Sequence, residues 1–504
     1  MRLNGACHRT GGALYRSRLE PQVEAWPRNL GMSRMNPLQK AESDAPSPSP
    51  PTVTVEIESL AYEGWGVGRS DGRVIFVQDT CPGDRVDVRL ERDLGSHGFA
   101  RVVRMLRNGP ARRSAACPVA GECGGCQWQQ IDERVQREQK LAVFRDLLRR
   151  IGGIAPSDAD GAPALGILSP RGPALGYRTR VRIAVQPRGP AFRRGGSREE
   201  VPVSGCPVAV EPLHRLLAAW AERPPAWFAS GDFREAEVTW CASPGGFQVN
   251  LITRPGRRPR QPKNEKDREG RGLFYAVDGR WPGGGPPRAL NPPGAWTYLI
   301  PPEALGRTEG LYMTAGPGEF LQPNPAENAA LIETVLDFSR PAADPGAAGE
   351  RALDLYCGVG NLSLPLALAG YGVLGVDSSS EGIRRARENA KRNGVDGCEF
   401  KALSVERALG RIRRGGDAFD LVVLDPPRAG CKKIVDAVAD IRPGRILYVS
   451  CNPATLARDL KSLAQRGYRL AESRLVDFFP QTYHIESVNL LLSAEVSGES
   501  GGMR

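Results

Sequence analysis

Histidine is scarce in this sequence, and long apolar runs are missing. Only four histidines occur in 504 residues, with no HExxH or GxSxG string, which argues against zinc peptidases and serine hydrolases. No run of about 18 apolar residues is present, so no membrane-spanning helix is predicted. The first thirty residues lack a continuous apolar segment ending in small residues, so a secretory signal is not expected. These absences predict a cytoplasmic protein with no membrane partner.

The chain is long and basic. Its length suffices for about three domains, and its formal net charge is +11. In a reducing compartment the eleven cysteines are not expected to form disulfides, so each is a buried apolar residue, a metal ligand or a nucleophile. Residues 1–52 end in a proline- and serine-rich tract that predicts a disordered arm. Residues 496–504 are predicted to be a short tail.

Short alternating apolar runs fill residues 53–110. Glycine, aspartate or proline separates them, in the strings VTVEIESL, RVIFVQ, DRVDVRLE and ARVVRML. This spacing predicts a small β-barrel. An OB-like barrel would bind nucleic acid, although other small β domains share the pattern.

The middle region, residues 111–305, is predicted to be β-rich after a helix at residues 132–151. Residues 171–198 contain eight arginines and no acidic residue. Such a patch of one charge sign favours RNA or DNA as a partner, because contacts with phosphates release counterions. The charged, breaker-rich stretch 255–272 predicts an exposed loop.

In residues 306–495, apolar strands alternate with amphipathic helices, which predicts a doubly wound parallel sheet. The first strand ends in DLYCGVGN, whose small residues let a turn approach a ligand at a helix N-terminus. Asp377 closes the next strand 19 residues after Gly358, where a carboxylate can bind a ribose. Because a full GxGxxG is absent, S-adenosylmethionine is favoured over a dinucleotide.

Three side chains are candidates for chemistry. Asp425 in DPPR and Cys451 in VSCNP each follow a strand at the carboxyl edge of this sheet. A thiol just before a helix N-terminus is expected to be stabilised as a thiolate and to stay accessible, so Cys451 is the candidate nucleophile. Glu486 precedes an apolar strand and is expected to have a raised pKa, as a general base needs.

Four further cysteines form a second candidate site, with the spacing C-x5-C-x2-C and a fourth 80 residues on: Cys117, Cys123, Cys126 and Cys206. Their number and the intervening glycines predict a metal site. Zinc and iron–sulfur are hard to separate from spacing alone. Because zinc sites more often use two close CxxC pairs, the arrangement favours a [4Fe–4S] cluster.

Together these motifs resemble a known family, the RNA uracil-C5 methyltransferases, in the branch that modifies 23S ribosomal RNA. The resemblance runs from about Val53 to Leu492 and rests on CPVAGECGGCQWQ, GYRTRVR, FLQPN, DLYCGVGN, DPPRAG, VSCNPATLARDL and FPQTYHIESV. It implies an α/β and β fold: an N-terminal OB-like TRAM β-barrel, a β-rich central iron–sulfur domain and a C-terminal Rossmann-like methyltransferase domain. It also implies a monomer that acts on RNA, with 23S rRNA as its target and with S-adenosylmethionine and a [4Fe–4S] cluster as cofactors.

The resemblance assigns roles to individual residues. It implies Cys451 as nucleophile, Glu486 as base, and cofactor contacts from Gln322, Tyr356, Asn361, Asp377, Ser404 and Asp425. Ser404 stands where the family commonly has asparagine, and Gln481 where histidine is usual. In the implied reaction, Cys451 adds to C6 of a flipped uridine, C5 takes the methyl group, and Glu486 removes the C5 proton.

Other functions fit parts of the pattern. A transfer-RNA uracil-C5 or an RNA cytosine-C5 methyltransferase would also use a cysteine adduct. An adenine methyltransferase would have an aromatic residue where Arg428 follows the paired prolines. A catalytically silent RNA-binding factor would need only the barrel and the arginines. A radical enzyme is disfavoured because CxxxCxxC is absent.

Overall fold

The computed structural model describes residues 52–154, 163–242, 245–258, 262, 265–266, 272–277, 297–340 and 349–494. The predicted arm, apart from its last residue, the predicted tail and part of the charged stretch 255–272 lie outside these residues. Within the described part of the chain, no helix is long and apolar enough to cross a membrane.

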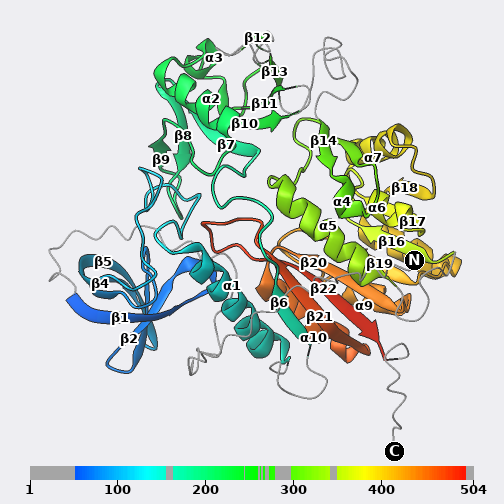
Figure 1. Cartoon of the computed structure of the whole chain (residues 1–504), viewed down its shortest axis with the longest axis horizontal. Helices are drawn as coiled ribbons and strands as arrows, with labels where there is room; N and C mark the ends of the chain where they lie inside the picture. Colours follow the sequence, from blue (N-terminus) through cyan, green and yellow to red (C-terminus); the bar gives the residue numbers. More distant parts are fainter. Residues whose placement is uncertain are drawn as a thin grey trace, which may run out of the picture. The chain divides into compact units, whose positions relative to one another are not determined.

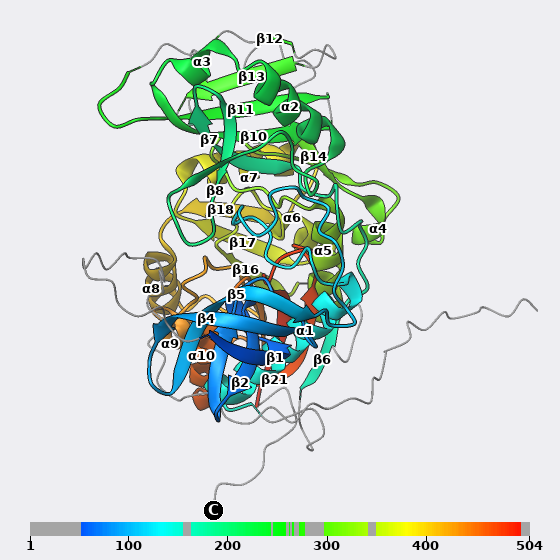
Figure 2. The same ribbon diagram turned by 90° about the vertical axis from the view of Figure 1, so that its left-hand side faces the viewer.

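Five strands close into a barrel in the order β1-β2-β3-β5-β4 (Figure 2). Their bounds are β1 Thr52–Leu60, β2 Gly66–Ser70, β3 Arg73–Val77, β4 Arg85–Asp93 and β5 His97–Arg107, with a short helical turn, η1, at Tyr62–Gly64. Alternate residues such as Val55 and Ile57 point inward and form the barrel core, while Thr54 and Glu56 do not contribute to it. The predicted small barrel is confirmed.

A helix, α1 (Glu133–Leu147), follows the segment that carries Cys117, Cys123 and Cys126. Asp132 caps its first turn by accepting a hydrogen bond from the backbone N–H of Arg134, and η2 (Leu148–Gly152) extends its C-terminus. The predicted helix at residues 132–151 is therefore confirmed.

The middle of the chain forms a seven-stranded sheet in the order β12-β13-β11-β10-β7-β8-β9, with the helices α2 and α3 (Figures 1 and 2). The bounds are β7 Arg180–Gln186, β8 Gly189–Arg193, β9 Glu200–Pro202, α2 Glu211–Glu222, α3 Ala226–Ala229, β10 Phe233–Cys241, β11 Gly246–Thr253, β12 Glu265–Lys266 and β13 Gly272–Val277. Its core includes an aromatic cluster in which Trp220, Trp227 and Phe228 contact one another and Phe233 contacts Trp227.

The arginine patch does not carry one charge sign in three dimensions. Strand β10 lies antiparallel to β7 and places Glu237 opposite Arg182. Five of the eight arginines have carboxylate partners: Arg171 with Glu333, Arg180 with Glu237, Arg182 with Glu235 and Glu237, Arg193 with Glu235, and Arg194 with Glu122 and Glu199. The expectation of an unbalanced patch is wrong for these five, because acidic residues distant in sequence pair with them.

The C-terminal region forms an eight-stranded sheet in the order β18-β17-β16-β19-β20-β22-β21-β6. Strands β16 to β20 are mutually parallel and β22 is antiparallel to β20. The strands are β6 Ala164–Ile167, β16 Arg351–Leu355, β17 Gly372–Asp377, β18 Cys398–Ala402, β19 Leu421–Leu424, β20 Arg445–Ser450, β21 Tyr468–Val476 and β22 Glu486–Ser493. The predicted doubly wound sheet is confirmed, with β6 as an additional edge strand from residues before the middle sheet.

Helices cover both faces of this sheet (Figure 1). They are α4 Pro302–Leu305, α5 Pro325–Ser339, α6 Ser363–Leu368, α7 Ser380–Arg392, α8 Val405–Gly415, α9 Val435–Asp440 and α10 Pro453–Gln465. Strands β14 Thr297–Ile300 and β15 Leu311–Thr314 form a separate two-stranded sheet. Successive residues of β20 face opposite sides: Ile446 and Tyr448 belong to the core with α8 to α10, and Leu447 and Val449 to the core with α5 to α7. Two apolar cores thus hold the sheet rigid and fix the positions of its strand ends.

Candidate active site

The carboxyl ends of five neighbouring strands carry five of the predicted site residues. Tyr356 follows β16, Asp377 ends β17, Ser404 follows β18, Asp425 follows β19 and Cys451 follows β20. Because these strands are parallel, all five residues lie along one edge of the sheet. Ligands of open α/β sheets bind at this edge, beside the point where strand order reverses, here between β16 and β19.

Strand pairing brings Cys451 and Glu486 together. In the antiparallel pair β20–β22, Ser450 lies opposite Ser487, which is the last pair of the ladder. The next residues along the two strands are Cys451 and Glu486. These two residues lie one step beyond the ladder, and the charge of Glu486 helps to raise the pKa of the Cys451 thiol, so thiol and carboxyl lie near each other at this edge.

The turn that bears Cys451 is held by its neighbours. Asn452 caps α10 by accepting hydrogen bonds from the backbone N–H groups of Ala454 and Thr455. The Asn452 side-chain amide and the Thr455 hydroxyl both donate to the carbonyl oxygen of Arg428, at 3.3 and 3.2 Å. These bonds tie the Cys451 turn to the loop that carries Asp425.

The electrostatic environment of Cys451 disfavours a thiolate. Burial, followed by the charge of Glu486, raises the pKa of the Cys451 thiol to about 12, and Arg428 acts in the opposite direction. The expectation of a thiolate stabilised by the helix is therefore wrong for the protein without substrate. Two carboxylates and a half-buried position outweigh the end of α10, whose first residue, Pro453, has no N–H to contribute.

The two carboxyl groups beside the thiol hold protons more tightly than usual. Burial, followed by the charge of Asp425, raises the pKa of Glu486 to about 8, while Arg428 and Lys140 lower it. Burial raises the pKa of Asp425 to about 7. The raised pKa that the sequence predicts for Glu486 is confirmed, and it suits a group that accepts a proton near neutral pH.

Two cations near the site were not among the predicted site residues. Arg428 lies within reach of the His484 ring, at 3.4 Å, and influences the pKa of both Cys451 and Glu486. Lys140 on α1 influences Glu486 as well. The string DPPRAG could have drawn attention to Arg428. The sequence around Lys140, a single lysine on an amphipathic helix, does not indicate that its side chain lies near Glu486.

The predicted ribose contact, Asp377, is hydrogen-bonded to the turn that follows β16. Its carboxylate oxygens accept hydrogen bonds from the backbone N–H of Gly358, at 3.1 Å, and of Ser379, at 2.8 Å. Gly358 and Gly360 have φ values of +55° and +92°, which the tight turn after β16 requires. The glycine turn and the carboxylate therefore form one structural unit.

Other predicted cofactor residues have local partners. The Asn361 amide exchanges hydrogen bonds with Asn328 and accepts one from the Tyr298 hydroxyl, each at 3.0 Å. The Ser404 hydroxyl caps α8 by accepting from the N–H of Arg407. Gln322 lies half-buried in the loop between β15 and α5. Asn361 and Ser404 thus have structural roles that their positions alone did not predict.

A buried carboxyl that was not predicted lies on β16. Burial raises the pKa of Asp354 to about 7, and its Oδ2 accepts a 2.5 Å hydrogen bond from Ser363. Its Oδ1 has no hydrogen-bond partner within the described part of the chain. The charges of Asp425 and Asp377 contribute to its raised pKa, so Asp354 belongs to the same acidic edge.

The barrel also reaches the site. The Tyr62 ring, in the turn between β1 and β2, lies edge-on against Tyr483, with ring centroids 5.7 Å apart. Burial raises the pKa of the Tyr62 hydroxyl, and the nearby groups Tyr483, Arg428 and Cys451 also affect it. Residues of the string AYEGWG thus lie near the catalytic candidates.

The four predicted metal-ligating cysteines line one cavity of about 360 Å³, together with Arg178, Gln129 and Val181. Burial raises the pKa of Cys123, Cys126 and Cys206, and the thiols affect one another's titration. Among the residues that the structure describes, no group of three or more His, Cys, Asp or Glu side chains is arranged to hold a metal ion. The four cysteines share the lining of one cavity.

Comparison with known proteins bears on both ends of the chain. A family model described as tRNA (Uracil-5-)-methyltransferase matches residues 309–494, and a TRAM domain model matches residues 51–103. An RNA methyltransferase of Gloeobacter violaceus is 35% identical over 467 residues, covering 86% of this chain and 95% of its own. The 23S rRNA (uracil(1939)-C(5))-methyltransferase RlmD of Pseudomonas fluorescens is 33% identical over 446 residues, covering 86% and 92%.

A solved structure is similar over most of its length. The Pyrococcus abyssi tRNA (uracil-54, C5)-methyltransferase in complex with S-adenosyl-L-homocysteine superposes with a TM-score of 0.61 and 25% identity, covering 87% of this chain and all of the other. Fold, strand-edge site and comparisons together define an S-adenosylmethionine-dependent RNA methyltransferase with an N-terminal TRAM domain. The chain belongs to the RNA uracil-C5 methyltransferase family.

Proposed function

We propose that this chain methylates C5 of a specific uridine in 23S ribosomal RNA, with Cys451 as nucleophile and Glu486 as base. The observation that carries the proposal is the register of β20 and β22, whose last pair, Ser450 and Ser487, is adjacent to Cys451 and Glu486. The ribosomal target is supported by the similarity to RlmD, which is named for its substrate, uracil 1939 of 23S rRNA.

The chemistry follows from the low reactivity of uracil C5. The Cys451 sulfur forms a bond to C6, and the displaced electron pair makes C5 nucleophilic. S-adenosylmethionine, when bound, supplies an electrophilic methyl group for C5. Glu486 then removes the C5 proton, the C5–C6 double bond re-forms, and the C6–S bond breaks to release the Cys451 thiolate. A base stacked in RNA cannot reach this edge, so the uridine must be flipped out.

At neutral pH both groups of the free protein mostly hold their protons. Glu486, with a pKa of about 8, must be ionised before it can accept the C5 proton, and Cys451, with a pKa of about 12, must lose its proton before it can add to C6. Arg428 is the group on this edge that lowers the thiol pKa. We therefore assign it the role of favouring the thiolate while uracil binds.

For S-adenosylmethionine we propose contacts from Gln322, Tyr356, Asn361, Asp377, Ser404 and Asp425. The glycine turn and Asp377 fit a nucleoside, since the turn leaves space and the carboxylate lies at the strand edge. Ser404 has the weakest support of the six, because its hydroxyl already caps α8. We propose the barrel at 53–110, the central RNA-binding region at 111–305 and the methyltransferase region at 306–495 as the functional divisions of the chain.

For the cysteine cavity we propose a [4Fe–4S] cluster held by Cys117, Cys123, Cys126 and Cys206. The proposal is supported by the four thiols that line one cavity, since iron–sulfur clusters are held by cysteine thiolates. Anaerobically purified protein should be brown and contain about four irons per chain, one cluster's worth. Stoichiometric zinc without iron would contradict the assignment.

The central experiment uses labelled S-adenosylmethionine with purified 23S rRNA, with tRNA as the competing substrate. Wild-type protein should place 5-methyluridine in 23S rRNA. Cys451→Ala should give neither product nor a covalent complex, and Glu486→Gln should accumulate a denaturant-stable adduct that carries the methyl group. Cys398→Ala is the matched control, because Cys398 is a half-buried thiol on the same sheet. Methylation of tRNA alone, or of cytosine, would show the corresponding alternative, and normal turnover by Cys451→Ala would exclude the mechanism.

A further inference from the structure

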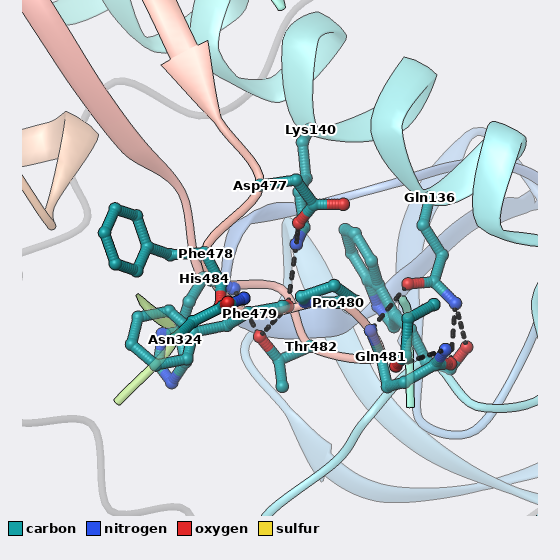
Figure 3. A network of polar contacts seen from close by, with 12 residues as sticks. Gln136, Lys140, Asn324, Asp477, Phe478, Phe479, Pro480, Gln481, Thr482 and His484 are labelled. Atoms are coloured by element: carbon teal, nitrogen blue, oxygen red, sulfur yellow. Dashed lines mark hydrogen bonds and ion pairs between the residues drawn. The ribbon is translucent and has the colours of Figure 1, made fainter. Parts of the chain in front are cut away.

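Gln481 occupies an unusual position in the loop that leads to Glu486. Its side chain is fully buried, with 0% exposure, and its φ of +70° lies in the region that side chains other than glycine rarely adopt. Such a conformation persists only where the surroundings hold it in place. The loop of residues 477–485 connects β21 to β22, and Figure 3 shows Gln481 in this loop, beside Gln136 of α1.

The hydrogen-bonding capacity of Gln481 is fully used. Its carbonyl oxygen accepts from the backbone N–H groups of Gln127 and Trp128, at 3.1 and 3.0 Å, and its N–H donates to Gln136 Oε1 at 2.8 Å. Its side-chain oxygen accepts from Arg113 at 2.8 Å and from Gln136 Nε2 at 3.0 Å. Its side-chain N–H₂ donates to Glu133 and to the carbonyl of Ala174, both at 3.3 Å.

The carbonyls before Gln481 are anchored one after another. The Phe478 oxygen accepts from the Asn324 amide at 3.1 Å, and the Phe479 oxygen from Lys140 Nζ at 2.9 Å. The Pro480 oxygen accepts from the Tyr177 hydroxyl at 3.2 Å. Lys140 also forms an ion pair of 2.6 Å with Asp477 (Figure 3). Four successive carbonyls, at 478 to 481, are therefore bound by groups from four different segments.

The same bonds link the cysteine segment to the catalytic edge. Gln127 directly follows Cys126, and its N–H is bound to Gln481. Five residues after Gln481, the loop enters β22 at Glu486, next to Ser487, which pairs with Ser450 of β20, and the charge of Glu486 influences the Cys451 thiol. A displacement of the backbone at Gln481 therefore also displaces the Glu486 carboxyl group, because only a short, hydrogen-bonded segment separates them.

We propose that Gln481 is a positioning residue for Glu486, fixing the 477–485 loop against the segment that carries Cys126. The inference rests on the proposed role of Glu486 as the C5 base. Without the side-chain amide, the loop keeps its backbone bonds at 478 to 481 but loses the bonds from the Gln481 side chain to Arg113, Gln136, Glu133 and Ala174, which help to hold its positive φ. The Glu486 carboxylate is then displaced from the position in which it can remove the C5 proton. Addition and methyl transfer, which depend on Cys451 and the strand edge, proceed, while deprotonation slows.

The test separates the steps of one turnover. Gln481→Met keeps the length of the side chain and removes every hydrogen bond of the side-chain amide, while the backbone hydrogen bonds of residue 481 remain available. It should form the RNA adduct at the wild-type rate, transfer the methyl group, and release product about 10- to 100-fold more slowly, because misplacement of about 1 Å costs that much. The readout is the lifetime of the methylated adduct on denaturing gels, with RNA affinity measured in parallel. Gln136→Met should give the same defect, and the double variant should be no slower than the single ones, since both act through one network.

The matched control is Gln248→Met, a buried glutamine on β11 whose amide has no hydrogen-bond partner within the described residues. It should release product normally. Release at the wild-type rate by Gln481→Met, or an equal slowing of addition and release, would overturn the inference. Should Gln481→Met fail to fold, Gln136→Met alone carries the test, with the same two outcomes. Normal turnover by Glu486→Gln would instead remove the proposed function on which the inference rests.

Discussion

The charges around Cys451 act in opposite directions on a single thiol. Glu486 and Asp425 raise its pKa, and Arg428 lowers it. Removing one of these charges should therefore change the thiolate population in a direction that depends only on the sign of the charge. This behaviour can be measured in the protein without RNA or cofactor.

Glu486→Gln should accelerate alkylation of Cys451 at pH 9, where the Glu486 carboxyl is ionised in the wild type. Its pKa of about 8 makes it neutral at lower pH, so the effect should fade as the pH falls to 7. Each unit by which the thiol pKa falls increases the thiolate about tenfold. The measurement is the rate of iodoacetamide labelling of the Cys451 peptide by mass spectrometry.

The opposite change tests the same electrostatics. Arg428→Gln should slow the labelling of Cys451, because it removes the charge that lowers the thiol pKa. Arg413→Gln, a surface arginine on α8 paired with Asp440, serves as control and should leave the rate unchanged. The same direction of change in both active-site variants would show that access, not charge, controls the thiol.

At the scale of elements, helix α1 joins the cysteine segment to the catalytic loop. Lys140 and Asp477 form an ion pair in which the side chains are only 2% and 4% exposed. Removing one member of a buried pair leaves the other charge without a partner in a medium of low dielectric constant, which is more costly than losing a surface pair. The helix therefore also provides an internal comparison, since it carries an exposed pair as well.

Lys140→Met should lower the free energy of unfolding by about 3–5 kcal/mol, the usual cost of an unpaired buried charge. Arg134→Met, which breaks the exposed i,i+4 pair with Glu138 on the same helix, should cost no more than about 0.5 kcal/mol. Urea midpoints of the two variants give the comparison. The double variant Lys140→Met/Asp477→Leu should recover part of the loss. Equal losses in the free energy of unfolding for the two single variants would mean that the buried pair contributes no more to stability than the exposed pair.

At the scale of the whole molecule, ion pairing changes the interpretation of the basic charge. Arg180 is 13% exposed on its side chain, pairs with Glu237 and donates to the carbonyl of Glu319, so it is part of the fold. Arg188 and Arg198 are exposed, and the described part of the chain offers them no ion pair. These two arginines are accordingly better candidates for phosphate contacts than Arg180 and Arg182.

Arg188→Gln/Arg198→Gln should weaken RNA binding and flatten its salt dependence. Each phosphate contact with a single strand contributes about 0.7 to the slope of log K against log salt, so the slope should fall by about 1.4. Arg413→Gln/Arg466→Gln removes the same charge from residues paired with Asp440 and should leave the slope nearly unchanged. Equal slopes for the two double variants would place the RNA contacts elsewhere.

The sequence alone determined the barrel, helix α1, the parallel sheet and the position of Cys451 at a strand end. These features depend on periodicity and on turn residues next to one another in the chain, such as Gly358 and Gly360 or Pro426 and Pro427. The family resemblance has the same local character, since each motif is a short string, and the similarity to RNA uracil-C5 methyltransferases confirms it.

The tertiary structure decided which distant groups meet. Glu486 is 35 residues from Cys451, and only the pairing of β20 with β22 brings them together. The pKa of Cys451, the carboxylate partners of the arginines and the network around Gln481 likewise depend on residues up to several hundred positions apart. Burial and Coulomb interactions act through space, so a local pattern predicts which groups are present but not the energies they impose on one another.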